Sequence, residues 1–349
     1  MPQTQTLLKD KPYEFVPLVS QCNREFYNSL AVRGDCIYSG RLNLKITVIS
    51  HLHIGSGERE FLQNGNVLKK QMRRNGKCII PGSSLKGAVR SVAEAVSYSC
   101  AVKAPDYNLK SALPDGNMSS CSDSRELCMA CYIFGMTGKD GNFKGKVRFG
   151  EFSLISEGSQ IERRKIPFMK GPHMDNERLY YCKACTAGNC ENCTIEAYDC
   201  AKNKQTKQKK EFRGRKFYST QKEVMLQQNE CSFYEMIKPG SVLKGEIVFQ
   251  DLRQEEGRLL AYALNIGNFF CMKLGYGKPL GYGKVKIELE SAESINSKYV
   301  SLPKIDSELV QKWANEYREE NTDEIKLLMS ELERIMRHGK KEPNIVYSY

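Results

Sequence analysis

The chain is organised around the stretch Ile80-Pro-Gly-Ser-Ser-Leu-Lys-Gly-Ala-Val-Arg90. Pro81 and Gly82 interrupt the strand that precedes them, and apolar residues then recur at helical spacing from Leu85 onward. The stretch therefore predicts a loop that leads into a helix over residues 83–97.

The start of this helix has the composition of an anion site. Ser83 and Ser84 are expected to provide the N-cap, and Lys86 and Arg90 lie within the first turns. Free backbone N–H groups at a helix start attract negative charge, and phosphate is the anion that we expect there. The alternative is that the serines only cap an ordinary helix and that the two cations lie on its solvated face.

The net charge of the chain favours a polyanionic partner. Its 349 residues include 53 Lys and Arg against 41 Asp and Glu, a formal charge of +12, and nucleic acid is the leading candidate. No run approaches the roughly 18 consecutive apolar residues of a membrane span, and the first residues lack a secretory pattern. We therefore expect an intracellular, cytoplasmic protein whose 14 cysteines bind metal rather than form disulfides.

Strand and helix patterns follow one another in the order strand, helix, strand, long insertion, strand, helix, strand. The predicted strands are residues 40–48, 145–155, 242–252 and 284–289, and the predicted helices are residues 83–97 and 255–272. This is the split βαβ order of a ferredoxin-like or RNA-recognition-type α+β domain. The open sheet face of such a domain commonly receives single-stranded RNA.

Three regions are expected. Residues 1–39 form an N-terminal extension, and residues 40–295 form the α+β domain, with Cys-rich insertions at about 100–135 and 156–240. Residues 303–349 form a C-terminal extension of two amphipathic helices, separated near Asn321-Thr322-Asp323, which should cap the second helix. These helices either pack back on the domain or dock to another subunit.

A glycine-lysine loop, residues 273–284, follows the second predicted helix and reads Lys-Leu-Gly-Tyr-Gly-Lys-Pro-Leu-Gly-Tyr-Gly-Lys. Its glycines would let the backbone approach a polyanion closely. Three lysines that could neutralise charge and two tyrosines that could stack on bases accompany them: Lys273, Lys278, Lys284, Tyr276 and Tyr282. The alternative is a flexible turn without a binding role.

Four motifs, in this order, resemble those of the RAMP superfamily. They are His53-Ile-Gly-Ser-Gly57, the Ile80–Arg90 stretch, Cys131-Tyr-Ile-Phe-Gly135 and Gly275-Tyr-Gly-Lys-Pro-Leu-Gly-Tyr-Gly283. The chain is most similar to backbone subunits of type III CRISPR effector complexes, of the Csm and Cmr kind, over roughly residues 40–290. Such proteins grip the backbone of a CRISPR RNA and splay the guide so that a target RNA pairs with it in short segments.

The resemblance also implies which residues contact the guide RNA. They lie at the helix start, in the glycine-lysine loop, beside the His-Ile-Gly element and in Phe212-Arg-Gly-Arg-Lys-Phe-Tyr218, a segment similar to one in less typical type III systems: Ser83, Ser84, Lys86, Arg90, Lys278, Gly281, Lys284, His53, Gly55, Arg213 and Arg215. The basic run over residues 202–216 would belong to a thumb-like projection. Structural roles stay open, with His53 as a hydrogen-bonded strand-end residue and the basic run as a solvated loop.

Slicing members of the resembled family carry an aspartate between the His-Ile-Gly and Ile-Pro-Gly elements. The corresponding loop, residues 58–77, contains no aspartate, and Asn66 stands near the expected position. An amide neither binds a divalent cation as a charged ligand nor takes a proton, so we expect a non-cleaving subunit. The alternative is a metal-dependent endoribonuclease that uses Mg²⁺ and Glu58 or Glu60 to cut target RNA.

The cysteines form two candidate zinc sites. Cys121, Cys128 and Cys131 supply three thiolates, and the fourth ligand is Cys100 or a histidine. A second set is complete in itself, although Cys200 or His173 could replace one member: Cys182, Cys185, Cys190 and Cys193. Paired Cys-x-x-Cys thiolates suit tetrahedral zinc, so structural zinc is expected, with an iron–sulfur cluster as the alternative.

Three functions follow from these patterns. The first is a non-cleaving CRISPR RNA-binding backbone or end subunit that works with target RNA and other subunits in antiviral defence. The second is the same fold acting as an endoribonuclease, and the third is an unrelated zinc-containing nucleic-acid-binding protein. Co-purified small RNA of uniform length would separate the first two from the third.

Overall fold

The computed structural model describes residues 12–26, 37–63, 65–101, 118–155, 160–167, 169, 181–182, 211–212, 214–224, 231–295 and 303–338. No helix within these ranges is both long enough and apolar enough to span a bilayer. The predictions for Arg213, Cys185, Cys190 and Cys193, and for the side chain of Cys182, lie outside the described residues.

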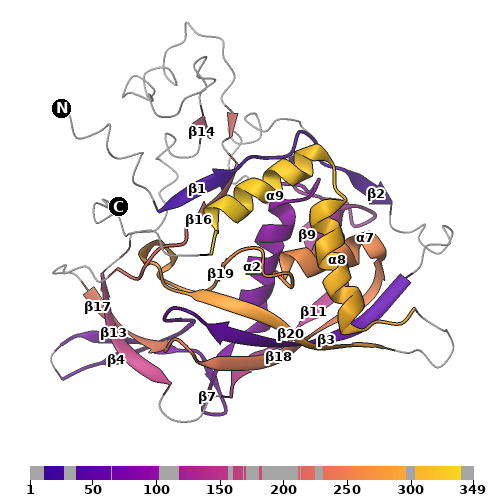
Figure 1. Cartoon of the computed structure of the whole chain (residues 1–349). Helices are drawn as coiled ribbons and strands as arrows, with labels where there is room; N and C mark the ends of the chain where they lie inside the picture. The colour runs from indigo at the N-terminus through magenta and orange to yellow at the C-terminus, as the bar shows by residue number, and fades with distance from the viewer. Residues whose placement is uncertain are drawn as a thin grey trace, which may run out of the picture.

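The central sheet has the strand order that the split βαβ pattern predicts. Its core order is β20–β3–β18–β12, with every pair antiparallel; the first three of these strands are labelled in Figure 1. These strands and the two helices that follow β3 and β18 are β3 (Ile37–Val48), α2 (Gly82–Ala95), β12 (Phe152–Leu154), β18 (Val242–Arg253), α7 (Gln254–Ala263) and β20 (Lys284–Ser294). The mixed α+β, ferredoxin-like fold is therefore confirmed.

Side-chain alternation explains why one face of this sheet is buried. In β3, Leu42, Leu44, Ile46 and Val48 are at most 1% exposed, whereas the residues between them are half-buried. The apolar face packs against α2 and α7, and all the long helices lie on this one side of the sheet (Figure 1). The core therefore sits between the sheet and its helices.

The opposite face of the sheet is covered by paired charges. Two of these pairs join neighbouring strands, Arg41 with Glu246 at 3.3 Å and Lys45 with Glu288 at 3.2 Å, and a third, Lys244 with Glu290 at 2.5 Å, joins β18 to β20 across β3. None of the described outward-facing residues in the middle of β3, β18 and β20 is aromatic. The aromatic side chains on which bases stack in RNA-recognition domains are therefore missing from this described part of the face.

Two predicted elements differ in extent from what their sequence patterns suggest. The strand predicted over residues 145–155 is divided into β11 (Val147–Phe149) and β12, and the amide of Gly150 between them donates to the Glu246 carbonyl. Helix α7 ends at Ala263, because Asn265 adopts a φ of 61° and its side-chain oxygen accepts from the amides of Phe269 and Phe270.

The C-terminal helices pack on the domain. They are α8 (Ser307–Glu319) and α9 (Asp323–Ile335), and the Thr322 side chain caps α9 by accepting from the Ile325 amide. Trp313 of α8 is 2% exposed and lies edge-on to Tyr38, with ring centroids 5.0 Å apart. The predicted cap is confirmed; α8 extends the core over α7 and β20, and α9 packs against β1 (Tyr13–Val16), β16 (Arg215–Tyr218) and α2.

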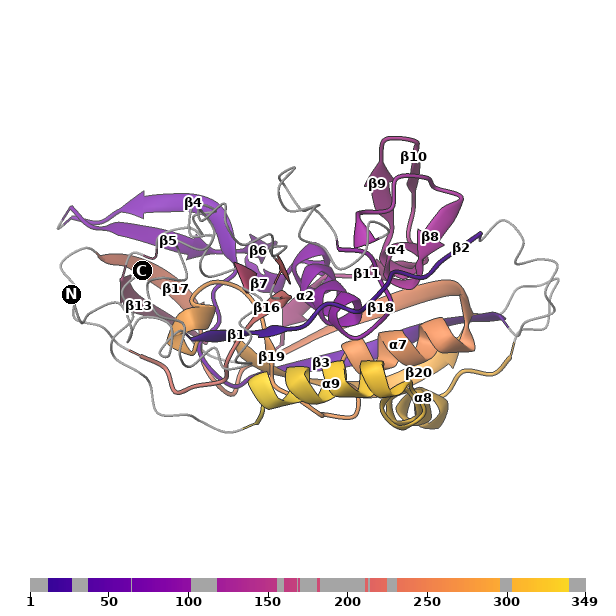
Figure 2. The same cartoon turned by 90° about the horizontal axis from the view of Figure 1, so that it is seen from above.

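A second sheet stands at one end of the molecule, where its β4–β5 hairpin projects (Figure 2). It has the order β13–β17–β5–β4, in which β17 and β5 are parallel. Its strands are β4 (Gly55–Phe61), β5 (Val67–Gln71), β13 (Ile161–Pro167) and β17 (Cys231–Ile237). The sheet joins the segment before α2 to segments near the two ends of the insertion over residues 156–240.

Shorter elements complete the described chain. They are β1 (Tyr13–Val16), β2 (Arg24–Phe26), β6 (Arg73–Arg74), β7 (Lys77–Ile80), β8 (Glu126–Cys128), α4 (Met129–Phe134), β9 (Met136–Gly138), β10 (Gly141–Phe143), β14 (Tyr181–Cys182), β15 (Glu211–Phe212), β16 (Arg215–Tyr218), β19 (Met272–Lys273) and the 3₁₀ turn η4 (Lys278–Leu280). The N-terminal strands β1 and β2 pair with β16 and β8. The N-terminal extension is thus tied to both Cys-rich regions.

Candidate functional site

The glycine-lysine loop lies directly against the His-Ile-Gly element. The amide of Tyr276 donates to the His53 carbonyl at 2.9 Å, and the amide of Gly283 donates to the His51 carbonyl at 2.9 Å. Gly275 has a φ of 71°, and a Cβ there would lie 2.2 Å from the His53 carbonyl oxygen. Only glycine permits this approach.

Backbone contacts continue from this junction to the start of α2. The Met72 amide donates to the Ile54 carbonyl at 2.7 Å, and the Ile79 amide donates to the Met72 carbonyl at 3.0 Å. Ile79 precedes the Ile80-Pro-Gly turn by one residue. Three of the sequence motifs, of which the first begins at His53 and the last ends at Gly283, therefore form one continuous structure.

The start of α2 presents unpartnered donors. Pro81 occupies the N-cap position and no side chain caps the helix, so the prediction of a serine N-cap is wrong. Ser83 and Ser84 lie in the first turn instead, and within the described chain their hydroxyl groups form no hydrogen bond. The ammonium group of Lys86 likewise has no carboxylate partner among the described residues, and burial, followed by the charge of Arg90, lowers its pKa. These groups are available to an anion.

Two of the predicted RNA-binding arginines are instead joined by a buried carboxylate. Glu94 of α2, whose side chain is 8% exposed, pairs with Arg90 at 2.7 Å and with Arg215 at 2.9 Å. Arg90 also donates to the Gly135 carbonyl, and Arg215 donates to the Cys100 carbonyl at 2.8 Å. Both arginines hold α2, β16 and the Cys-rich segment together.

The lysines at the two ends of the glycine-lysine loop point into the protein. Lys273 and Lys284 are 5% and 3% exposed, and they donate to the carbonyls of Ser219 at 2.5 Å and Gln221 at 3.0 Å. Tyr282 is 1% exposed, so it cannot offer its ring to a base. Lys278, in contrast, is half-buried as a residue, and its ammonium group has no partner among the described residues.

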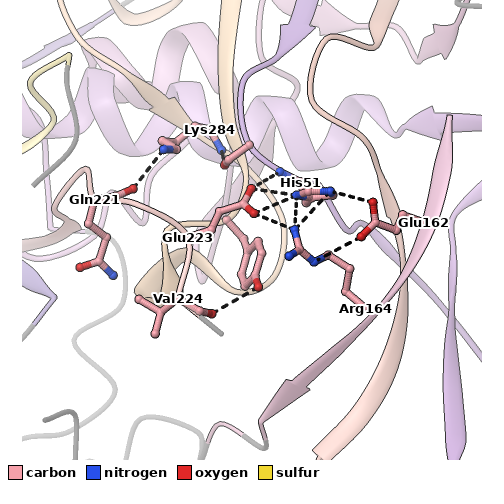
Figure 3. A network of polar contacts seen from close by, with 9 residues as sticks. His51, Glu162, Arg164, Gln221, Glu223, Val224 and Lys284 are labelled. Carbon is pink, nitrogen blue, oxygen red and sulfur yellow. Dashed lines mark hydrogen bonds and ion pairs between the residues drawn. The ribbon is translucent and has the colours of Figure 1, made fainter. Parts of the chain in front are cut away.

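An ionic network holds residues 219–224 against this loop (Figure 3). Glu223 accepts from the backbone amide of His51 at 2.7 Å and pairs with Arg164 at 2.8 Å, and Glu162 closes the group at 3.3 Å from His51. Burial disfavours the charge of Glu223, but the hydrogen bonds from His51 and the charge of Arg164 outweigh it and lower its pKa. No spacing in the sequence connects these residues, and sequence reasoning missed them.

His53 is held in an aromatic group beside the second sheet. Its Nδ1 lies 2.7 Å from the Glu235 carbonyl, and its ring stands edge-on to Tyr234, with centroids 5.0 Å apart. Tyr276 stacks on Tyr234 at 4.8 Å, and Lys69 donates to the Tyr234 hydroxyl at 2.7 Å. Of the two loop tyrosines, Tyr276 is the one that is only half-buried.

The weak catalytic candidates do not converge. Glu60 pairs with Lys70 on the neighbouring strand, whereas Glu58 is exposed on β4 and Asn66 lies near the end of the hairpin. Among the described residues, the grouping of His, Cys, Asp and Glu side chains able to hold a metal consists of cysteines alone. Neither glutamate therefore belongs to such a group of described residues, and the carboxylate that shares Lys70 with Glu60, that of Glu235, is paired with this lysine at 3.6 Å.

Four cysteines do converge. The sulfur atoms of Cys100, Cys121, Cys128 and Cys131 all lie within 4.8 Å of one another and are buried, so Cys100 completes the predicted set of three. The Cys100 sulfur lies 3.6 Å from the Cys131 sulfur and 3.7 Å from the Cys128 sulfur. A tetrahedral site with zinc–sulfur bonds of about 2.3 Å would place its sulfurs about 3.8 Å apart, so the group fits a metal such as zinc.

Polar groups around the sulfurs strengthen this fit. The Cys128 amide donates to the Cys121 sulfur at 3.4 Å, and an Arg90 nitrogen lies 3.6 Å from the Cys131 sulfur. Four thiolates and one divalent cation carry a net charge of −2, which a guanidinium group partly compensates. Arg90 would therefore compensate part of the negative charge of the metal centre, in addition to its ion pair with Glu94.

Comparison with family models places the chain among known proteins. The model of the RAMP superfamily matches residues 45–286, from the middle of β3 to the start of β20. Comparison with curated proteins gave no match. The matched range contains the described α2 start, the cysteine group and the glycine-lysine loop.

Proposed function

Because the chain belongs to the RAMP superfamily, whose members are associated with CRISPR-related RNA-binding complexes, we propose that it is a CRISPR RNA-binding backbone or end subunit of a type III effector ribonucleoprotein. It would hold the guide for pairing with a target RNA, next to other subunits, in antiviral defence. One observation carries this proposal: the His-Ile-Gly element, the glycine-lysine loop and the start of α2 join into one structure that presents unpartnered donors.

The proposed contacts divide into direct and supporting ones. Ser83, Ser84 and Lys86 at the start of α2 would bind a phosphate of the guide, because the two hydroxyls and the ammonium group have no partner among the described residues. Lys278, His53 and Gly55 would border the same strand. The remaining predicted residues would act by positioning these groups: Arg90, Arg215, Gly281 and Lys284.

Salt-dependent binding tests these roles. Lys86→Gln should weaken binding of a guide-length RNA uniformly and reduce the slope of log affinity against log salt by about 1, as expected for one lost phosphate contact. Lys312→Gln is the control, because Lys312 is exposed on α8 and pairs with Glu316. Equal effects of the two substitutions would contradict the assignment. Recovery of the protein from its native host without small RNA of uniform length would also contradict the proposal.

We also propose that the subunit does not cut target RNA, because neither Glu58 nor Glu60 belongs to a described group of three or more side chains that could hold a cation, and Glu60 is paired with Lys70. The assembled complex, given Mg²⁺ and RNA complementary to its guide, should leave the segment opposite this subunit intact. Cleavage there that is lost in Glu58→Gln or Glu60→Gln would establish the endoribonuclease instead.

Cys100, Cys121, Cys128 and Cys131 would hold structural zinc. The ion would supply a rigid cross-link between the end of α2, the loop before β8 and helix α4. Through the Cys100 carbonyl and Arg215, that cross-link reaches β16 and hence the segment that packs on the glycine-lysine loop. In this way the metal centre would stabilise the RNA-binding surface without touching RNA.

A further inference from the structure

His53 has one of its ring nitrogens fixed by the fold. The side chain is 3% exposed, and Nδ1 lies 2.7 Å from the carbonyl oxygen of Glu235. A carbonyl oxygen only accepts hydrogen bonds, so Nδ1 must carry the proton. The edge-on contacts with Tyr234 and Tyr276 fix the ring plane as well.

The surroundings keep this imidazole neutral. Burial, and then the charge of Lys69, lower the pKa of His53. The hydrogen bond to the Glu235 carbonyl and the charge of the Glu235 carboxylate act in the opposite direction without offsetting burial, and that carboxylate is also engaged by Arg73 at 2.6 Å and by the Gln71 amide at 3.0 Å. A neutral ring protonated on Nδ1 has a lone pair on Nε2, and that nitrogen can only accept a hydrogen bond.

Nε2 is left free for a ligand. It forms no hydrogen bond with the described residues. Gly55 lies beside it, and a Cβ at that position would lie 3.3 Å from Nε2. Glycine therefore keeps clear a position from which a donor could reach this nitrogen.

We propose that Nε2 of His53 accepts a hydrogen bond from a ribose 2′-hydroxyl and so makes the site prefer RNA to DNA. This inference rests on the proposed RNA binding and names the group that is read. Phosphate oxygens cannot donate to a lone pair, whereas the 2′-hydroxyl is a donor that every ribonucleotide carries and DNA lacks. The adjacent glycine-lysine loop, with Tyr276 bonded to the His53 carbonyl, would bring the sugar-phosphate strand to this position.

Chemically matched ligands test the proposal on the unaltered chain. The full-length protein, freed of co-purified RNA, is titrated with one sequence as RNA, as DNA and as 2′-fluoro RNA, which keeps an RNA-like sugar but cannot donate. RNA should bind about 3- to 10-fold more tightly than 2′-fluoro RNA, the range of one neutral hydrogen bond. Equal binding of RNA and 2′-fluoro RNA would overturn the proposal.

Two substitutions locate the effect at His53. His53→Asn keeps a donor near the Nδ1 position but has no acceptor near Nε2, so its RNA affinity should fall to that for 2′-fluoro RNA. His53→Gln can place its amide oxygen near Nε2 and should keep part of the preference. If His53→Asn weakened all three ligands by the same factor, the residue would be structural only. If no RNA bound even to the unaltered chain, the proposed function itself would fail.

Discussion

Gly281 offers a sharp test of how residues 219–224 pack on the glycine-lysine loop. Its φ is 83°, and a Cβ there would lie 2.2 Å from the Lys222 carbonyl oxygen and 3.0 Å from that of Gln221. Gly281→Ala therefore has two costs. The left-handed backbone costs about 1–2 kcal/mol for any residue with a Cβ, and residues 221–222 must also move away.

The second cost follows from the bonds that such a movement breaks. Lys284 would lose its bond to the Gln221 carbonyl, and the Val224 amide would lose its bond to the Leu280 carbonyl. Each buried group left without a partner costs about 1–3 kcal/mol. Gly281→Ala should therefore lower the free energy of unfolding by about 3–8 kcal/mol in total.

Two other glycines separate these contributions. Gly240 has a φ of 85° and no atom within 4 Å of the position that an added Cβ would take, so Gly240→Ala should show the backbone cost alone, about 1–2 kcal/mol. Gly87 lies inside α2 with open space around it, so Gly87→Ala should stabilise by up to about 1 kcal/mol. Urea unfolding midpoints at a constant m value measure all three. A cost at Gly281 no greater than that at Gly240 would refute the described packing.

Three further predictions concern the metal centre, the buried ion pairs and a buried lysine. Cys100→Ser should remove one equivalent of zinc per chain by elemental analysis, while Cys22→Ser should not; retention of zinc in Cys100→Ser would exclude Cys100 as a ligand. Glu94→Gln leaves the guanidinium groups of Arg90 and Arg215 without their carboxylate and should lower the free energy of unfolding by about 3–5 kcal/mol. Glu151→Gln, which removes a pair with the exposed Arg74, should lower it by at most about 1 kcal/mol; equal unfolding midpoints of the two variants would contradict this. Burial lowers the pKa of Lys273 to about 7, so between pH 7 and about 10 the unfolded chain binds more protons than the folded chain. The free energy of unfolding should therefore rise with pH in this range, and Lys273→Met should reduce the rise measured by urea unfolding at each pH.

Local patterns predicted the central sheet because each of its strands carries its own signal. The alternation in β3 and in the first half of β20 predicts a buried face without knowledge of any partner. The Cys128-x-x-Cys131 spacing likewise predicts a metal site, and Cys100 was one of the two kinds of fourth ligand that the sequence left open. These features depend on residues close together in the chain or on side-chain chemistry alone.

Other features depend on contacts that the sequence does not encode locally. The second sheet pairs β5 with β17, whose contacting residues are about 165 positions apart, and β1 pairs with β16 over a similar separation of about 200. Residue type alone also misleads: Lys273 and Lys284 read as surface cations but are buried donors, and Pro81 takes the N-cap position expected for a serine. Burial is a property of the assembled structure.

The position of β3 at the centre of the main sheet has a consequence during synthesis on the ribosome. Both of its neighbours, β18 and β20, begin at residue 242 or later, whereas β3 is complete at Val48. At a translation rate of about 5–20 residues per second, the strand emerges about 10–40 seconds before either neighbour exists. Nascent chains of this protein therefore expose an unpaired apolar strand for that interval, which makes them natural clients for chaperones that shield hydrophobic segments.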